Sequence, residues 1–371
     1  MALKNSAFYP GLHVMTFFYK MAGCPYIDTI YGADDTQSRL LVRFMRKFLR
    51  GAYLFICICM SLGPVLTYLA RRILFPWYLD PITAIIRTGL YLVVYIQITV
   101  SFLNLTFRSG QLSEIFETAA KLEPKLHIDR TSVRRRMLKV SILCLLYVLL
   151  DACKYITGLS VHIPAVFQLL KGHSDYIRWL YILAYIVGCI LVAAWYNVAV
   201  WHIVFFAEMF REYFAALGNR LELELKQESQ AQKRGATVLS TEGVRLNLVA
   251  IQRLLRSVNS FIGVEVLCFY AVSVFYLCAT FYSTAISEIG IFWMIVRVAY
   301  ATILSAGLAI TARAASRMSD EAARILCIIQ AAKFEALTDA ETHRVVGAVI
   351  TYTIVLIQTN EGVMGPKCVN G

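Results

Sequence analysis

The chain has 371 residues, of which 58% are hydrophobic, and its mean hydropathy is +0.62. A soluble domain with a single core is far less apolar, so this composition indicates a membrane protein. The formal net charge of +12 does not indicate a nucleic-acid binder, because the basic residues lie between apolar runs rather than on one soluble face.

Seven membrane spans are predicted along the chain. The first 50 residues end in a basic amphipathic stretch, Arg39 to Arg50, which we expect to lie along the inner membrane surface. Apolar runs follow, most of them close to the roughly 20 residues that cross the hydrocarbon core. Their approximate ranges are 52–70, 82–104, 137–160, 179–206, 261–285, 291–311 and 345–358.

The fourth and fifth spans are predicted to continue as helices outside the membrane. Apolar residues at helical spacing follow the fourth span and precede the fifth, and the polar stretch 226–243 lies between them as a loop. We therefore expect a helical hairpin that protrudes into the aqueous phase. The residues on its apolar faces are Phe210, Phe214, Leu217, Leu221, Leu248, Ile251, Leu255 and Val258.

The distribution of basic residues predicts the orientation. Segments 1–51, 105–136, 211–258 and 312–344 hold 7, 7, 8 and 5 Lys plus Arg, whereas the loops between them and the tail hold 2, 2, 0 and 1. The positive-inside rule therefore predicts a cytoplasmic N-terminus and an extracellular C-terminus. This is the reverse of a G-protein-coupled receptor, and Asp129-Arg130 precedes the third span instead of following it. Asn104-Leu105-Thr106 matches a glycosylation acceptor, but this topology places it inside, where it would not be used.

No metal site or cofactor is expected. The cysteines include no Cys-x-x-Cys pair, and the six histidines show no zinc spacing. Seven cysteines fall in apolar runs and are predicted to be buried free thiols that pack as small hydrophobes. They are Cys57, Cys59, Cys144, Cys153, Cys189, Cys268 and Cys278.

Polar and aromatic side chains in the outer halves of spans two to six form a candidate ligand pocket. Ionisable groups at this depth usually face a bundle interior or a water-filled cavity, and aromatic rings with polar tips suit a small organic ligand. Interfacial aromatic belts, or pairing of Asp151 with Arg87, Arg297 or Lys154, would explain the same residues structurally. The candidates are Arg87, Tyr91, Asp151, Lys154, Tyr155, Tyr185, Tyr282, Trp293, Arg297 and Tyr300.

Two acidic residues need separate treatment. Glu265, in the inner part of the fifth span, is costly without a partner, and we expect it to pair with an arginine near the cytoplasmic side. Glu361, just beyond the last span, could concentrate cations at a pore mouth or be simply solvated.

The last span ends in Thr351-Tyr352, five largely apolar residues and Gln358. This pattern resembles the C-terminal signature of insect gustatory receptors, in which Phe usually stands where this chain has Thr359. Val258 to Gly263, entering the fifth span, resembles the same family. The inverted topology, short outer loops and long inner helical extensions are similar to the insect gustatory and olfactory receptor superfamily along most of the chain.

The resemblance implies a ligand-gated channel for monovalent and divalent cations in the plasma membrane of a sensory neuron. It implies a homo- or hetero-tetramer with one pore lined by the last helix of each subunit, and a small-molecule tastant bound by helices two to six. In that arrangement Gln358 is a wetted lining group, and Tyr352 is a packing and hydrogen-bonding anchor. Helix packing is the alternative role for Gln358.

The chain departs from the family pattern before the signature. The family normally carries a long cytoplasmic helix there, whereas residues 313–343 provide 31 residues. Either the pore helix is assembled from a compressed segment, or the sequence lacks a piece. The predicted organisation is an N-terminal cytoplasmic segment (1–51), a six-helix sensing bundle with cytoplasmic extensions (52–312), a shortened linker (313–343), and a pore helix with an extracellular tail (344–371).

Three functional classes follow from these patterns. A tastant-gated channel is favoured, with bitter or other small organic compounds preferred over sugars. A membrane transporter of organic solutes and an olfactory-type subunit that needs a co-receptor are the alternatives. An enzyme is disfavoured because no nucleophile-base pair or metal set converges at one depth, so no catalytic residue is assigned.

Overall fold

The structure is a computed structural model. It describes residues 8, 48–49, 51–53, 55–59, 62, 81–157, 167–168, 170–172, 174–232, 242–286 and 291–331. Within these ranges the chain is helical, without any strand, as the sequence predicts. The long helices are α3 (Pro81–Phe107), α4 (Ser109–Leu126), α5 (Arg130–Thr157), α7 (Asp175–Gln232), α8 (Glu242–Ile286) and α9 (Ile291–Ala331).

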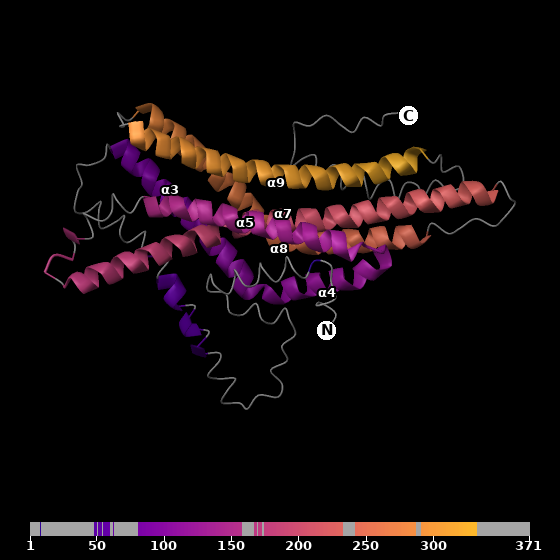
Figure 1. Ribbon diagram of the computed structural model, residues 1–371, viewed down its shortest axis with the longest axis horizontal. Helices are drawn as coiled ribbons and strands as arrows, with labels where there is room; N and C mark the ends of the chain where they lie inside the picture. Colours follow the sequence, from indigo (N-terminus) through magenta and orange to yellow (C-terminus); the bar gives the residue numbers. More distant parts are fainter. Residues whose placement is uncertain are drawn as a thin grey trace.

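The three longest helices in the described residues show that predicted spans and the segments beside them form continuous helices. α7 has 58 residues and α8 has 45, so each joins a predicted span to its apolar extension without a break. α7 reaches Gln232, which corrects the expected start of the loop at 226 by more than a turn. α9 likewise runs from the sixth predicted span through Ala331, so much of the segment after 312 is one continuous helix. Figure 1 shows α5, α7, α8 and α9 extending along the long axis of the molecule.

α4 was not anticipated as a helix within the polar segment after the second span. Its apolar residues recur every three or four positions, and the side chains of Leu112, Ile115, Phe116, Ala119 and Leu122 are buried. α4 ends at His127, which adopts the left-handed conformation with φ of 50°. The chain then turns back into α5.

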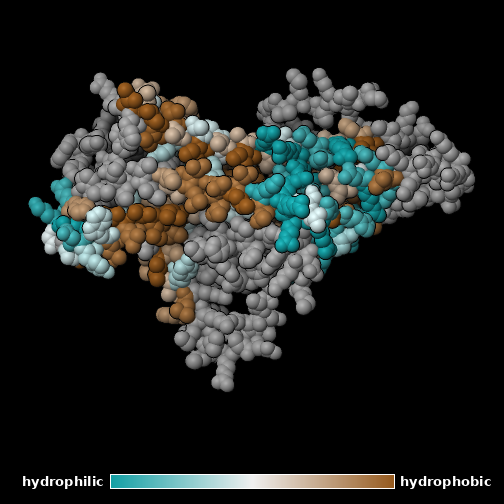
Figure 2. Space-filling model, in the orientation of Figure 1, coloured by the Kyte–Doolittle hydropathy of each residue, from teal (hydrophilic) through white to brown (hydrophobic). Residues whose placement is uncertain are grey.

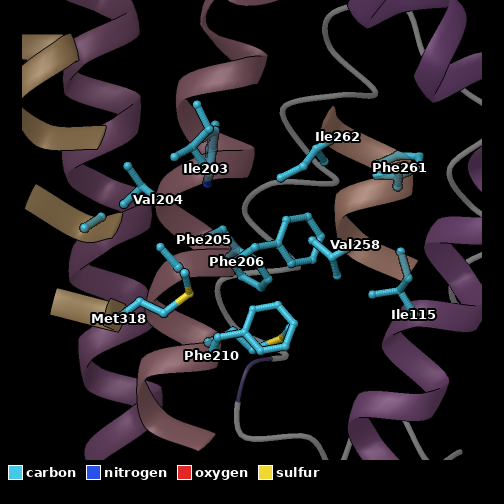
Figure 3. Close-up of a cluster of buried hydrophobic side chains, with 14 of the residues drawn as sticks. Ile115, Ile203, Val204, Phe205, Phe206, Phe210, Val258, Phe261, Ile262 and Met318 are labelled. Atoms are coloured by element: carbon cyan, nitrogen blue, oxygen red, sulfur yellow. The ribbon is translucent and has the colours of Figure 1, made fainter. Parts of the chain in front are cut away.

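α7 is the centre of the bundle, in contact with α3, α4, α5, α8 and α9. Every described residue from Leu191 to Phe210 on α7 is buried, which suits a helix surrounded on all sides. Figure 3 shows Phe205, Phe206 and Phe210 of α7 packed among side chains from α4, α8 and α9. Phe116 stacks on Phe206 with ring centroids 6.0 Å apart. The residues labelled around them are Ile115, Ile203, Val204, Val258, Phe261, Ile262 and Met318.

The predicted hairpin faces are also buried in the structure. Phe210, Phe214, Leu217 and Leu221 on α7, and Leu248, Ile251 and Val258 on α8, are all under 9% exposed. Leu255 is half-buried against the same core. At this end, Phe8 packs edge-on against Tyr213, with ring centroids 5.5 Å apart.

Exposed apolar side chains cover the other part of the bundle. Figure 2 shows a hydrophobic region between a hydrophilic patch at one end and a larger hydrophilic area toward the other. Four helices in the described residues are long and apolar enough to cross a membrane, within α3, α7, α8 and α9. The third predicted span, on α5, is not among them. Most of the first predicted span and all of the seventh lie outside the described residues.

The cysteine prediction holds in part. All seven cysteines are free thiols. Cys57, Cys144 and Cys189 are buried as expected, but Cys59, Cys153 and Cys278 are exposed, because they lie on helix faces that point away from the bundle.

Candidate functional site

The structure distributes the predicted pocket residues over five helices. Arg87 and Tyr91 lie on α3, Asp151, Lys154 and Tyr155 on α5, Tyr185 on α7, Tyr282 on α8, and Trp293, Arg297 and Tyr300 on α9. The side chains of Arg87, Tyr91, Lys154, Tyr155 and Trp293 are outside the described part of the chain.

Among the described candidates, Asp151 is a buried carboxylate with a well-defined hydrogen bond to another helix. Its side chain is buried, and Asn197 of α7 donates a hydrogen bond from Nδ2 to the Asp151 carboxylate at 2.8 Å. The same Nδ2 donates to the Ala193 carbonyl at 2.8 Å. Oδ1 of Asn197 is buried and has no partner among the described residues. The Asp151–Asn197 pair therefore offers an acceptor that a ligand hydroxyl or amine could use.

The remaining described candidates do not all converge on this pair. Tyr185 is buried in a small cluster with Ile182 and Cys189, separate from the main core. Tyr282 is exposed at the bundle surface, whereas Arg297 and Tyr300 are half-buried on α9. Tyr282 is thus the candidate whose position best fits an interfacial aromatic.

A second buried polar group joins α3, α7 and α8. Nδ1 of His202 on α7 lies 2.9 Å from Oε2 of Glu265 on α8, and both side chains are fully buried. Nδ2 of Asn104 on α3 donates to the same carboxylate oxygen at 3.4 Å. The arginine expected beside Glu265 is therefore replaced by a histidine, because α7 brings His202 to the same depth.

The α3 end of this junction also binds the α8 backbone. Nδ2 of Asn104 donates to the Phe261 carbonyl at 2.8 Å, and Nη1 of Arg108 donates to the Ser260 carbonyl at 2.8 Å. Gln111 reaches the Ser257 carbonyl at 3.3 Å. These contacts fix α3 and the start of α4 to α8 where its predicted span begins. Two of the three acceptors lie within the Val258–Gly263 stretch that the sequence singled out, and the third, Ser257, directly precedes it.

Further along α3, Nε2 of Gln97 donates to Oγ of Ser101 at 3.3 Å, and both residues are fully buried. Oε1 of Gln97 and Oε1 of Glu265 have no partner among the described residues. A buried acceptor without a donor costs free energy in a membrane protein. The stability of the protein therefore depends strongly on how α3, α7 and α8 pack at this junction.

A charged cluster links α5, α7 and α9 just outside their predicted membrane spans. Arg211 of α7 pairs with Glu208 at 2.9 Å and with Glu212 at 2.7 Å. Arg136 of α5 pairs with Glu212, and Arg317 of α9 lies 3.8 Å from Glu208. Since Glu208 and Glu212 are mostly buried, these pairs hold the three helices in register.

The sequence did not single out His202 or Asn197, and it indicated Asn104 only as a glycosylation acceptor. Their signal was present, because each is a polar residue in an apolar run. Their partners are 46 to 161 positions away in the chain, however, so only the packed structure identifies them. Thr351, Tyr352 and Gln358 lie outside the described residues.

Over the described residues, these features define a helical membrane protein in which α7, α8 and α9 continue well past their predicted membrane spans. Among solved structures, it is similar to the insect olfactory receptor OR5 from Machilis hrabei, with a TM-score of 0.59 and 13% identity over 94% of this chain and 99% of that chain. The same receptor in complex with eugenol gives a TM-score of 0.58, 14% identity and the same coverage. No protein-family model and no curated protein sequence matches the chain.

The chain therefore has the fold of an insect olfactory receptor. This is the fold that the resemblance of its sequence to the gustatory and olfactory receptor superfamily implies.

Proposed function

We propose that the chain is an insect gustatory receptor: a tastant-gated, nonselective cation channel subunit in the plasma membrane of a sensory neuron. The observation that carries the proposal is the structural match over 94% of the chain to an insect olfactory receptor. The signature from Thr351 to Gln358 supports the gustatory branch of that superfamily.

The proposed channel is a homo- or hetero-tetramer with one central pore. The last helix of each subunit lines the pore, with Tyr352 as a packing anchor and Gln358 as a wetted group near the outer exit. Monovalent and divalent cations pass through it. The N-terminus is cytoplasmic and the C-terminus extracellular, as the positive-inside rule predicts.

The proposed ligand is a small organic tastant, bitter compounds being favoured over sugars. A structural neighbour binds eugenol, which is a small organic molecule. The buried Asp151–Asn197 pair supplies an acceptor for one polar group of such a ligand. Binding opens the channel only by the difference in affinity between open and closed states. The contacts between α3 and α8 could couple a ligand-induced shift of α3 to the position of α8.

An olfactory-type subunit is the second candidate, because both structural neighbours are forms of an olfactory receptor. Such a subunit would give current only together with a co-receptor. A transporter of organic solutes, by contrast, would accumulate its substrate without a large conductance.

Whole-cell recording with a panel of tastants and odorants tests these alternatives. Surface labelling first confirms that the expressed chain reaches the plasma membrane. We expect a cation current evoked by at least one small organic compound from the chain expressed alone. A current that needs a second subunit identifies the olfactory-type alternative, and silence with or without candidate co-receptors contradicts the channel proposal.

A further inference from the structure

The N-terminal turns of α5 carry a basic surface that the channel function does not use. Arg134, Arg135, Arg136 and Lys139 occur within six residues. Arg136 turns toward α7 and pairs with Glu212. Arg134, Arg135 and Lys139 are exposed instead. We call these three residues the α5 basic surface.

No described carboxylate forms an ion pair with the α5 basic surface. The nearest acidic group along the chain, Asp129, accepts hydrogen bonds from the backbone N–H of Thr131 at 3.0 Å and from its hydroxyl at 2.8 Å. Arg135 influences Asp129 only through its charge. Three cations spread over about one and a half helical turns thus remain available for an external anion.

The same side of α5 becomes apolar immediately after the basic surface. Leu138, Ile142, Leu143, Leu146, Leu149 and Leu150 are all exposed, between 42% and 64%. Because residues three and four apart lie on one helix side, Arg135 and Lys139 are continuous with this stripe. A stripe of large exposed apolar residues on a membrane protein faces lipid chains.

The depth of the basic surface matches the headgroup region. The predicted third span, 137–160, begins at about Met137. Lys139 then lies at the boundary, and Arg134 and Arg135 lie about 5 Å beyond it. Long basic side chains at this position extend to phosphate groups while their stems stay among lipid chains.

We propose that the α5 basic surface binds the headgroup of a polyanionic phospholipid, of the phosphoinositide class, while the adjacent apolar stripe contacts its acyl chains. Three neighbouring cations suit a headgroup with several phosphates better than one with a single charge. The proposed orientation places this lipid in the inner leaflet. The headgroup contact itself depends neither on that orientation nor on the proposed channel activity.

The test uses the full-length chain purified in a neutral detergent and a fluorescent short-chain phosphatidylinositol 4,5-bisphosphate as the probe. We compare the wild type with R134Q/R135Q/K139Q. Each cation near a lipid surface contributes about fivefold in affinity, so the triple variant is expected to bind about 100-fold more weakly. Phosphatidylcholine with the same fluorophore should bind both proteins equally.

The matched control is K121Q/K125Q/R253Q, which removes the same charge from exposed residues of α4 and α8. No large exposed apolar residue lies within the two helical turns after any of the three, and the exposed stripe of α8 begins only at Val264. Its affinity should stay within about twofold of the wild type. R134K/R135K, which preserves the charge, should also bind and provides a second comparison if the neutral variant unfolds. A loss of affinity in the control variant equal to that in R134Q/R135Q/K139Q would overturn the proposal. It would also be overturned if the wild type bound soluble inositol trisphosphate as tightly as the lipid.

Discussion

At the residue scale, the contact between His202 and Glu265 is the most consequential polar contact in the bundle. Both side chains are fully buried, and their atoms approach to 2.9 Å. A buried pair of this kind adds little net stability over a well-packed apolar pair, but the loss of one partner leaves a polar group without compensation. The pair therefore favours one arrangement of α7 and α8 over alternatives.

We expect Glu265→Ala to destabilise the protein by about 3 kcal/mol, the usual scale for removing one partner of a buried pair. Glu265→Gln should cost less, because it retains a hydrogen-bonding group. In a double-mutant cycle, H202A/E265A should lose less than the sum of the single variants. Thermal unfolding in detergent measures this, and strictly additive losses would contradict the pairing. Glu222→Gln, which breaks a half-exposed pair with Arg324, is the control with a small effect.

Gly307 of α9 is required where Tyr147 of α5 crosses it. A Cβ at position 307 would lie 2.8 Å from Cζ of Tyr147 and closer still to its hydroxyl, which donates to the Ile303 carbonyl at 3.2 Å. We expect Gly307→Ala to destabilise the protein by about 1–3 kcal/mol through overpacking. Tyr147→Phe should restore part of that loss.

Gly89→Ala is the matched control for this substitution. Its Cβ would meet only Cζ of Phe275, at 3.7 Å, which is an ordinary contact. A thermal midpoint for Gly307→Ala as high as that for Gly89→Ala would show that α5 and α9 do not approach as closely as described.

At the element scale, Asp129 sets where α5 begins. Its carboxylate accepts hydrogen bonds from Thr131, and these hold the pKa of Asp129 below its ordinary value. A lowered pKa means that the contribution is complete above the unfolded value, near pH 4, and is lost as pH falls further. At neutral pH the cap is therefore fully formed.

We expect Asp129→Ala to reduce hydrogen-exchange protection in the first turn of α5, including Val133, whose N–H donates to the Asp129 carbonyl. Asp129→Asn should retain most of the protection, since asparagine also caps helices. Equal fraying in the two variants would mean that the side-chain acceptor does not set the start of the helix.

The elements differ in how well the sequence predicted them. Phe210, Phe214, Leu217 and Leu221 have the correct spacing, and α7 buries all four. α4 was missed because charged residues dilute its apolar pattern, although Leu112, Ile115 and Phe116 already show it. The loop boundary at 226 was wrong because a polar sequence in water can still continue a helix that packing has begun.

At the scale of the whole molecule, the packing at Asn104 and the orientation of the chain give two separate predictions. Nδ2 of Asn104 donates to the Phe261 carbonyl, so the acceptor nitrogen is engaged in helix packing. We therefore expect no glycan at Asn104, measured as an unchanged gel mobility after glycosidase treatment.

The predicted orientation is tested by a C-terminal epitope, which should be accessible on intact cells. An epitope detected only after permeabilisation would reverse the topology.

The candidate site was predicted less completely than the fold. Asp151 was recognised because a carboxylate in an apolar run is unusual, but its partner Asn197 could be assigned only after α5 and α7 were packed together. Tyr282 has the same sequence character as Tyr185, yet one is exposed and the other buried. Composition specifies which side chains can bind a ligand, whereas helix rotation decides which of them face one another.

Our central proposal is that this chain conducts cations in response to a small organic ligand through a pore lined near Gln358. The most direct measurement is the ligand-evoked current of a Gln358→Cys variant, before and after an external charged thiol reagent that leaves the wild-type current unchanged. We predict that a positively charged reagent sharply reduces the cation current of the variant alone. An evoked current that modification at 358 leaves unchanged, or no current from receptors confirmed at the cell surface, would contradict the account.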